Sequence, residues 1–168
     1  MKALRALWCM ALMTVAVPAQ TPSSQAADQN LYSISLKTSI LQMEKEYGHM
    51  NDSVPGESVR TNYRQMVVEK DPVITDALPT EFDGHAVEYL DDKGLIERFR
   101  NLGKSYAILR VRPIQNEGTA LKISVVVYWV SYKKHRLQFG LSDWSDVEFR
   151  YECEKQQFVI SSVKLGGI

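Results

Sequence analysis

The residues best suited to acid–base chemistry gather in one short segment: Asp83, His85, Glu88, Asp91 and Asp92. A strand is expected over residues 85–90, where His85 and Glu88 would face opposite sides because neighbouring side chains alternate. Asp83 would share a side with His85 if the turn between them stays extended. An aspartate that orients a histidine can serve as a general base, so Asp83 and His85 are the candidate catalytic pair. The competing interpretation is structural, with turn aspartates, a helix cap and a half-exposed histidine.

Other chemistries have little support in the sequence. The chain has three histidines, of which His49 lies three positions from Asp52 and far from His85, so no metal-ligand spacing recurs. The sequence has no G-x-S-x-G motif and no glycine-rich phosphate loop, which are the signatures of hydrolytic serines and nucleotide sites. We therefore expect neither a metal nor a cofactor.

Aromatic and basic residues give a second group of candidates, for ligand binding. Basic side chains beside aromatic rings can hold an anion or a glycan, although charged residues at a turn are more often a solvated hairpin tip. Tyrosines in the strands could surround a pocket or simply fill it. The ligand-binding candidates are Tyr106, Tyr128, Trp129, Tyr151, Lys133, Lys134 and Arg136.

A long strand over residues 119–132 organises the C-terminal half. This segment has no proline or glycine and is rich in β-branched and aromatic residues, which favour strands. Its odd positions from Leu121 to Trp129 are all apolar. Further strands are expected at 105–113, 137–141, 147–153 and 158–165, with turns at 133–136, 142–145 and 154–157. These strands would form an antiparallel meander.

Helices are expected in the N-terminal half. Leu36, Ile40, Met43 and Tyr47 form one helical stripe over residues 31–47. A second helix is expected over about 57–70, ending before Pro72. A third would begin at Asp91 or Asp92 and end at Gly103, with Arg98 and Arg100 near its negative end.

The first nineteen residues resemble a secretory signal peptide. Two basic residues precede an apolar run from Ala6 to Val17, which is too short to span a bilayer core. We expect export to the periplasm or the medium, a flexible tether over 20–30 and one α+β domain over 31–168. Cleavage would leave Cys153 alone, most simply as a buried small hydrophobe. Twenty basic and twenty acidic residues balance, which argues against nucleic acid as a partner.

The order of these elements is similar to that of the NTF2-like superfamily, over roughly residues 31–165. The resemblance implies N-terminal helices packed on a strongly curved C-terminal antiparallel sheet, forming a cone with a pocket at its wide end; a cystatin-like layout is the alternative. No family motif matches. Three functions remain open: an exported non-catalytic binding module for a small molecule or protein, a cofactor-independent hydrolase, isomerase or dehydratase, and a component of an envelope assembly that dimerises through its sheet face.

Overall fold

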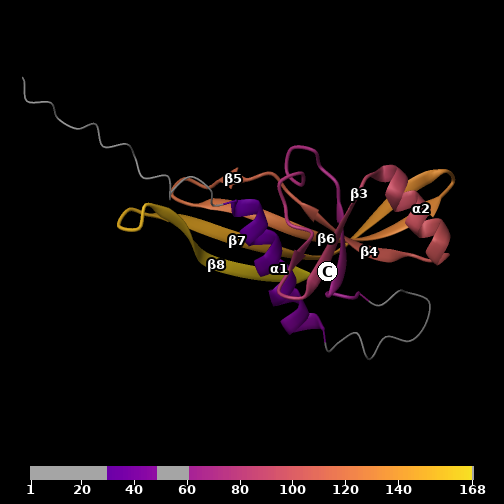
Figure 1. The fold of residues 1–168 in the computed structure, drawn as a ribbon, viewed down its shortest axis with the longest axis horizontal. Coiled ribbons are helices and arrows are strands. Elements are labelled where there is room, and N and C mark those ends of the chain that lie inside the picture. Colours follow the sequence, from indigo (N-terminus) through magenta and orange to yellow (C-terminus); the bar gives the residue numbers. More distant parts are fainter. Residues whose placement is uncertain (1–29, 49–60, 168) are drawn as a thin grey trace, which may run out of the picture.

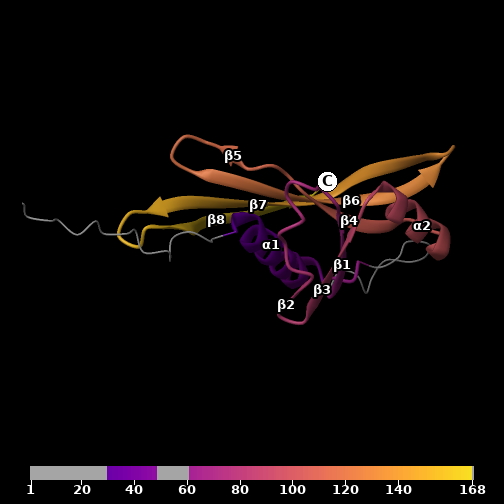
Figure 2. The ribbon, with the colours of Figure 1, turned by 45° about the horizontal axis from the view of Figure 1, so that its top comes forward.

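The computed structural model describes residues 30–48 and 61–167, which form an α+β fold. Within these residues lie two helices and one mixed sheet of eight strands that does not close on itself. The strand order is β2-β3-β1-β4-β6-β7-β8, and β5 pairs with β6 outside this series. In Figures 1 and 2, α1 lies against the middle part of the long strands, whereas α2 lies near the end that carries the β6–β7 turn.

The helices are α1 (Leu31–Tyr47) and α2 (Asp92–Leu102). The strands are β1 (Gln65–Glu69), β2 (Glu81–Phe82), β3 (His85–Leu90), β4 (Tyr106–Val111), β5 (Gln115–Asn116), β6 (Leu121–Lys133), β7 (Arg136–Glu152) and β8 (Gln157–Gly167). The meander β4-β6-β7-β8 is antiparallel, as the sequence predicts.

The two helices cover opposite faces of the sheet. Residues of α1 share a core cluster with Leu109 and Val111 of β4, whereas Leu95 of α2 shares a second cluster with Tyr106 and Ile108. Because side chains alternate along a strand, these two sets point to opposite sides of β4. The sheet therefore has two separate apolar cores.

Both helices begin and end as their sequences predict. Leu36, Ile40 and Met43 of α1 are fully buried, and Asn30 accepts a hydrogen bond from the Ser33 amide at its N-terminus. The Asp91 side chain accepts one from the Gly94 amide, which satisfies an otherwise unpaired N–H of α2. Gly103 ends α2 with φ +67°, a left-handed conformation that favours glycine.

The predicted helix over 57–70 is wrong where it can be compared. Residues 57–60 lie outside the described residues, and Gln65–Glu69 form strand β1 instead. This strand lies between β3 and β4 and is parallel to both, so the sheet is mixed and not wholly antiparallel. Met66, Val67 and Val68 are all buried. A short apolar run covered on both faces looks the same in a helix and in a parallel strand.

The predicted turn at 142–145 is also wrong. Strand β7 runs through it without a break, with a register shift in its pairing to β6 between Val126 and Tyr128. Trp144 lies opposite Gly166 of β8, where a side chain of any size would collide with the indole. The missing side chain at Gly166 thus leaves room for the Trp144 indole within the β7–β8 pair. Trp144 can therefore be part of a continuous strand instead of a turn.

The predictions for Cys153 and for the N-terminal segment have different outcomes. Cys153 is exposed in the β7–β8 turn, so its predicted burial is wrong. The predicted signal peptide and almost all of the predicted tether lie outside the described residues. Within residues 30–48 and 61–167, neither helix is long and apolar enough to cross a membrane.

Candidate functional site

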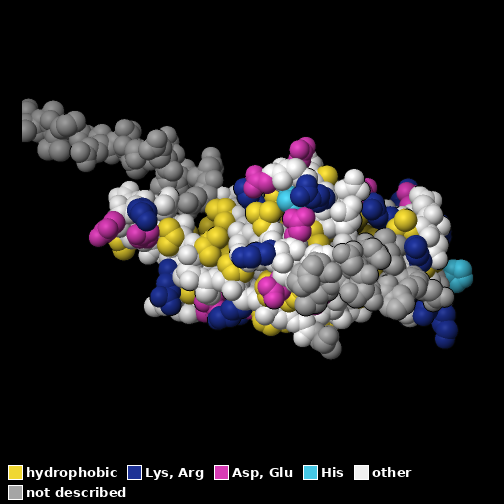
Figure 3. Space-filling view, turned by 90° about the horizontal axis from the view of Figure 1, so that it is seen from below, with side chains coloured by type: hydrophobic (Ala, Val, Ile, Leu, Met, Phe, Trp, Pro, Cys, Tyr) yellow, Lys and Arg dark blue, Asp and Glu magenta, His cyan; other side chains and the backbone are white. Residues whose placement is uncertain are grey.

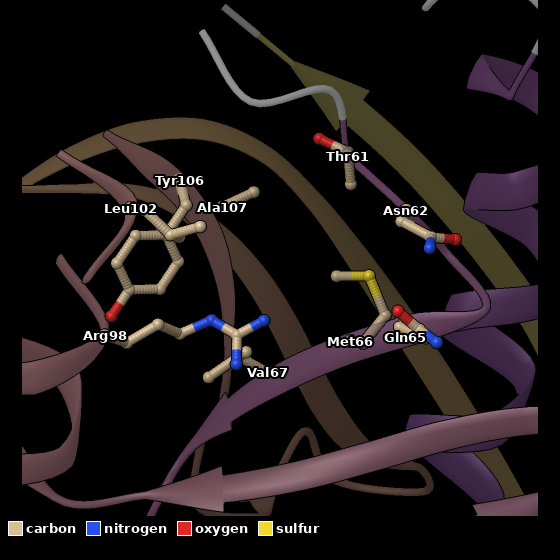
Figure 4. Close-up of a pocket in the computed structure, with 9 residues that line it drawn as sticks. All are labelled: Thr61, Asn62, Gln65, Met66, Val67, Arg98, Leu102, Tyr106 and Ala107. Carbon is tan, nitrogen blue, oxygen red and sulfur yellow. The ribbon is translucent and has the colours of Figure 1, made fainter. Parts of the chain in front are cut away.

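A pocket opens where strands β1 and β4 separate. The two parallel strands share a single residue pair, Val68 and Leu109, and their N-terminal ends diverge from that point. The space between them has a volume of about 190 Å³. It is lined by Thr61, Asn62, Gln65, Met66, Val67, Arg98, Leu102, Tyr106 and Ala107 (Figure 4).

A second pocket of about 270 Å³ lies on the β3 side of β1. It is lined by Gln65, Met66, Ala86, Val87, Glu88 and Arg98. Gln65, Met66 and Arg98 therefore border both pockets. We call the two pockets together the Arg98 site.

The sequence of α2 places Arg98 over the sheet. Leu95, Arg98 and Leu102 are three and four residues apart, so they lie along one side of the helix. Leu95 is fully buried in the second core cluster and fixes this side against the sheet. The long Arg98 side chain then reaches across the Tyr106 ring, whose centroid lies 5.6 Å from the guanidinium carbon.

The Arg98 guanidinium is only partly satisfied. Its Nη1 donates a hydrogen bond to Glu88 Oε2 over 2.5 Å. Among the described residues, its Nε is buried with no hydrogen-bond partner. Figure 4 shows the guanidinium extending toward the space between Tyr106 and Met66. Because a guanidinium carries five N–H donors, it keeps unused donor capacity here.

The surroundings of Arg98 combine apolar and polar groups. Met66, Val67, Leu102 and Ala107 supply apolar surface, and Asn62 and Gln65 supply amides. Tyr106 donates a hydrogen bond from its hydroxyl to the Leu95 carbonyl over 2.9 Å, and burial raises the pKa of Tyr106 to about 12. The Tyr106 hydroxyl is therefore a structural donor and no acid near neutral pH. The pocket therefore offers both apolar surface and hydrogen-bonding groups to a small molecule.

The predicted catalytic pair has a different geometry from the one expected. His85 is only 4% exposed, and its Nε2 lies 2.8 Å from Glu44 Oε2 on α1. Its Nδ1 lies 3.0 Å from the backbone carbonyl of Asp83. The Asp83 carboxylate points elsewhere and pairs with Lys37 at 2.8 Å. The structure thus brings His85 together with Glu44, 41 positions earlier, and not with the Asp83 side chain.

The environment of His85 is closed. Phe82 stacks on the imidazole with ring centroids 5.7 Å apart, and both ring nitrogens face an oxygen acceptor. The hydrogen bond from His85 lowers the pKa of Glu44. Neither of the two pockets described above is lined by His85 or Glu44. This pair links α1 to β3 and leaves neither ring nitrogen free for a substrate.

The predicted ligand-binding residues lie in separate places. Tyr106 alone of these lines the Arg98 site. Tyr128 accepts a hydrogen bond from Arg112 at 2.7 Å and lies under the Arg110 guanidinium. Trp129 pairs with Ala107 and Gly140 across the sheet, and Tyr151, 51% exposed, contacts Phe158.

The basic candidates form a hairpin tip. Lys133, Lys134 and Arg136 are exposed at the turn between β6 and β7. Lys134 and His135 both have positive φ angles, 50° and 61°, as a two-residue turn between twisted strands requires. Figure 3 shows basic side chains gathered at this end of the molecule. The three residues do not meet any of the predicted aromatic ligand residues in a described pocket.

Sequence reasoning missed Arg98 as a site residue, and also Asn62, Gln65 and Met66. The one available signal was the placement of an arginine between Leu95 and Leu102 on the apolar side of α2. Comparison with known proteins adds no further assignment: the chain matches no protein-family model, no curated protein and no solved structure. Among the described residues, no cluster of His, Cys, Asp and Glu could hold a metal ion.

Proposed function

We propose that this protein is an exported, non-catalytic binding module that takes a small ligand at the Arg98 site. One observation supports this most directly: a guanidinium with unused donors borders two adjoining pockets with apolar walls. A buried donor without a partner costs free energy, typically about 1–3 kcal/mol. A ligand that accepts hydrogen bonds from Arg98 would recover part of this cost.

The enzymatic alternative has one observation in its favour, the contact between His85 and Glu44. An acid–base role requires a ring nitrogen within reach of a substrate. Both nitrogens of His85 already face acceptors, and the ring is stacked on Phe82. The contact therefore supports a structural role better than a catalytic one.

The dimerising alternative calls for a large apolar patch near Trp129 or Trp144 and for a dimer in solution. These two tryptophans pair with residues that face opposite sides of the sheet, Ala107 and Val126 respectively. A dimer would therefore use one of the two faces, and the mass of the protein in solution tests it.

Export and the NTF2-like cone remain parts of the proposal. Export is supported by the basic and apolar pattern of residues 1–19. The NTF2-like proposal is supported in part by the element order, in which a helix, three short strands and a second helix precede the meander β4-β6-β7-β8. Mass measurement of the mature protein from the culture medium or periplasm tests the first, and superposition of experimental coordinates on NTF2-like folds tests the second.

A fragment screen tests the binding function. We expect that a set of soluble fragments, added to ¹⁵N-labelled protein, shifts the amide signals of Met66 and Val67 more than those elsewhere. Gln65→Trp should abolish these shifts because Gln65 is exposed and borders both pockets. Gln138→Trp, the same change at an exposed position of β7, is the matched control and should retain them. If no fragment shifts these signals in the unmodified protein, the proposed function is wrong.

A further inference from the structure

We infer that the ligand of the Arg98 site is a small monocarboxylate with a compact apolar body, of about the size of benzoate. This inference rests on the proposed binding function and specifies its ligand class. The recognising groups would be Arg98 for the carboxylate and the wall formed by Met66, Val67, Leu102 and Ala107 for the apolar part.

The charge of the ligand follows from the donors of Arg98. Its Nη1 is engaged by Glu88, while Nε is buried with no hydrogen-bond partner among the described residues, and Nη2 lies on the same edge of the guanidinium as Nε. These two nitrogens form one edge of the planar guanidinium, and a carboxylate matches such an edge with two parallel hydrogen bonds. Nε is shielded in the free protein, so a small rotation of the Arg98 side chain accompanies binding. The Arg98 side chain as a whole is 35% exposed, which leaves room for this rotation.

The size of the ligand follows from the pocket beside Tyr106. Its volume is about 190 Å³, and an apolar cavity of roughly 150 Å³ accommodates benzene. One aromatic ring or a branched chain of similar size therefore fits. Burying that body against the apolar wall supplies affinity that a bare anion cannot gain.

The restriction to one carboxylate follows from Glu88. Its carboxylate lies 2.5 Å from Arg98 Nη1 and is 54% exposed at the second pocket. A second ligand carboxylate extending into that pocket would meet this negative charge, and like charges repel. The same repulsion acts more weakly on the first carboxylate, so removal of the Glu88 charge should strengthen binding.

Titrations of the full mature chain with benzoate, benzamide and inorganic phosphate test this inference. The readouts are isothermal calorimetry and the amide shifts of Met66 and Val67. We expect benzoate to bind with a dissociation constant on the order of 1 mM, which is typical of a ligand of this size. Benzamide has the same body without the charge, and phosphate has charge without the body. Both should bind at least about tenfold more weakly, benzamide because it loses the charged hydrogen bonds and phosphate because it loses the buried apolar body.

Variants with opposite expected effects make the test sharper. Arg98→Gln should weaken benzoate binding about tenfold or more, and Arg98→Lys, which keeps the charge but not the planar edge, should weaken it less. Glu88→Gln should strengthen it about threefold. Arg136→Gln removes the same charge at the hairpin tip and should change nothing. Thermal unfolding of each variant verifies that it is folded.

Several results would overturn the inference. They are equal binding of benzamide and benzoate, phosphate binding as tight as that of benzoate, unchanged benzoate binding in folded Arg98→Gln, and weaker binding in Glu88→Gln. If other fragments shift the Met66 and Val67 signals but benzoate does not, only the ligand class is wrong. If no compound shifts them, the proposed function fails as well.

Discussion

Two charged pairs connect strand β3 to the two helices, and they differ in how completely their hydrogen bonds are satisfied. His85 points to one face of β3 and meets Glu44 of α1, whereas Glu88 points to the other face and meets Arg98 of α2. The His85 side chain is 5% exposed and both of its ring nitrogens have acceptors. The Arg98 side chain is 35% exposed and has donors without acceptors beside two pockets.

This difference indicates that the two pairs have different roles. A buried imidazole whose ring nitrogens both face oxygens of the protein holds one conformation and presents neither nitrogen to a ligand. A partly exposed cation with unused donors contributes little to folding, because exposed ion pairs are worth only about 0–1 kcal/mol. We therefore propose a stabilising role for the His85 pair and a binding role for the Arg98 pair.

The largest expected effect comes from removing the His85 side chain. His85→Ala should lower the free energy of unfolding by about 2–3 kcal/mol, because it leaves a cavity under Phe82 and Glu44 without its partner. Urea denaturation measures this. His135→Ala at the exposed turn is the control and should change stability by less than about 0.5 kcal/mol. A similarly small effect of His85→Ala would refute the structural role.

A smaller effect on stability is expected at Tyr106, whose ring packs against the Arg98 guanidinium. Tyr106→Phe should cost about 1 kcal/mol by removing the hydrogen bond to the Leu95 carbonyl, while the ring that faces Arg98 remains. Benzoate binding should therefore stay within about twofold of the unmodified protein, since no contact to Arg98 is lost. A large loss of binding would instead make the hydroxyl a ligand contact.

The same variant tests the ionisation of Tyr106. Because burial raises its pKa from 10 to about 12, the folded state favours the neutral phenol. Its contribution to stability is complete below pH 10 and is lost as the pH rises through 12. In an ultraviolet titration, the difference between the curves of the unmodified protein and of Tyr106→Phe should correspond to one phenol that ionises near pH 12. Ionisation near pH 10 would show that Tyr106 is solvated.

A still smaller effect on stability is expected for Arg98→Gln. The pair with Glu88 is partly exposed, at 35% for Arg98 and 54% for Glu88, so its loss should change the free energy of unfolding by less than about 1 kcal/mol. Urea denaturation of Arg98→Gln and His85→Ala under the same conditions compares their free energies of unfolding directly. If Arg98→Gln destabilises the protein as much as His85→Ala, then the assignment of separate roles is wrong.

The weakest effect should appear in the pH dependence of stability. The hydrogen bond from His85 lowers the pKa of Glu44 below 4.5. The contribution of Glu44 is therefore present above about pH 4.5 and is lost as the pH falls through its folded-state pKa. Thermal unfolding between pH 6 and pH 3 should show a shallower decline in Glu44→Gln than in the unmodified protein. An equal slope in both would indicate that Glu44 gains nothing from His85.

Much of the fold follows from local sequence signals. The apolar stripe of α1, the Asp91 and Gly103 caps of α2 and the alternation of β6 each encode their element locally. Strand β1 could not be recognised in this way, because Met66, Val67 and Val68 are buried on both faces and so have no alternation. The continuity of β7 through Trp144 depends on Gly166, 22 positions later, which leaves space for the indole.

The site was harder to predict than the fold. The opposite orientations of His85 and Glu88 follow from strand alternation, and Tyr106, one of the predicted ligand-binding residues, lines a pocket. Their partners do not follow from the sequence, since Glu44 meets His85 through the packing of α1 on the sheet. From the sequence, Arg98 has only the role of a favourable charge near the end of α2. Its place beside two pockets becomes visible only once the position of β1 is known. The pocket itself exists because two parallel strands diverge, which depends on tertiary structure alone.

The most direct test follows the Nε–Hε signal of Arg98 by NMR during a titration with benzoate. The account predicts that this signal shifts and saturates together with the amides of Met66 and Val67, while the ring signals of His85 stay unchanged. A titration in which the His85 signals move and the Arg98 signal does not, at benzoate concentrations that saturate the calorimetric binding, would contradict it.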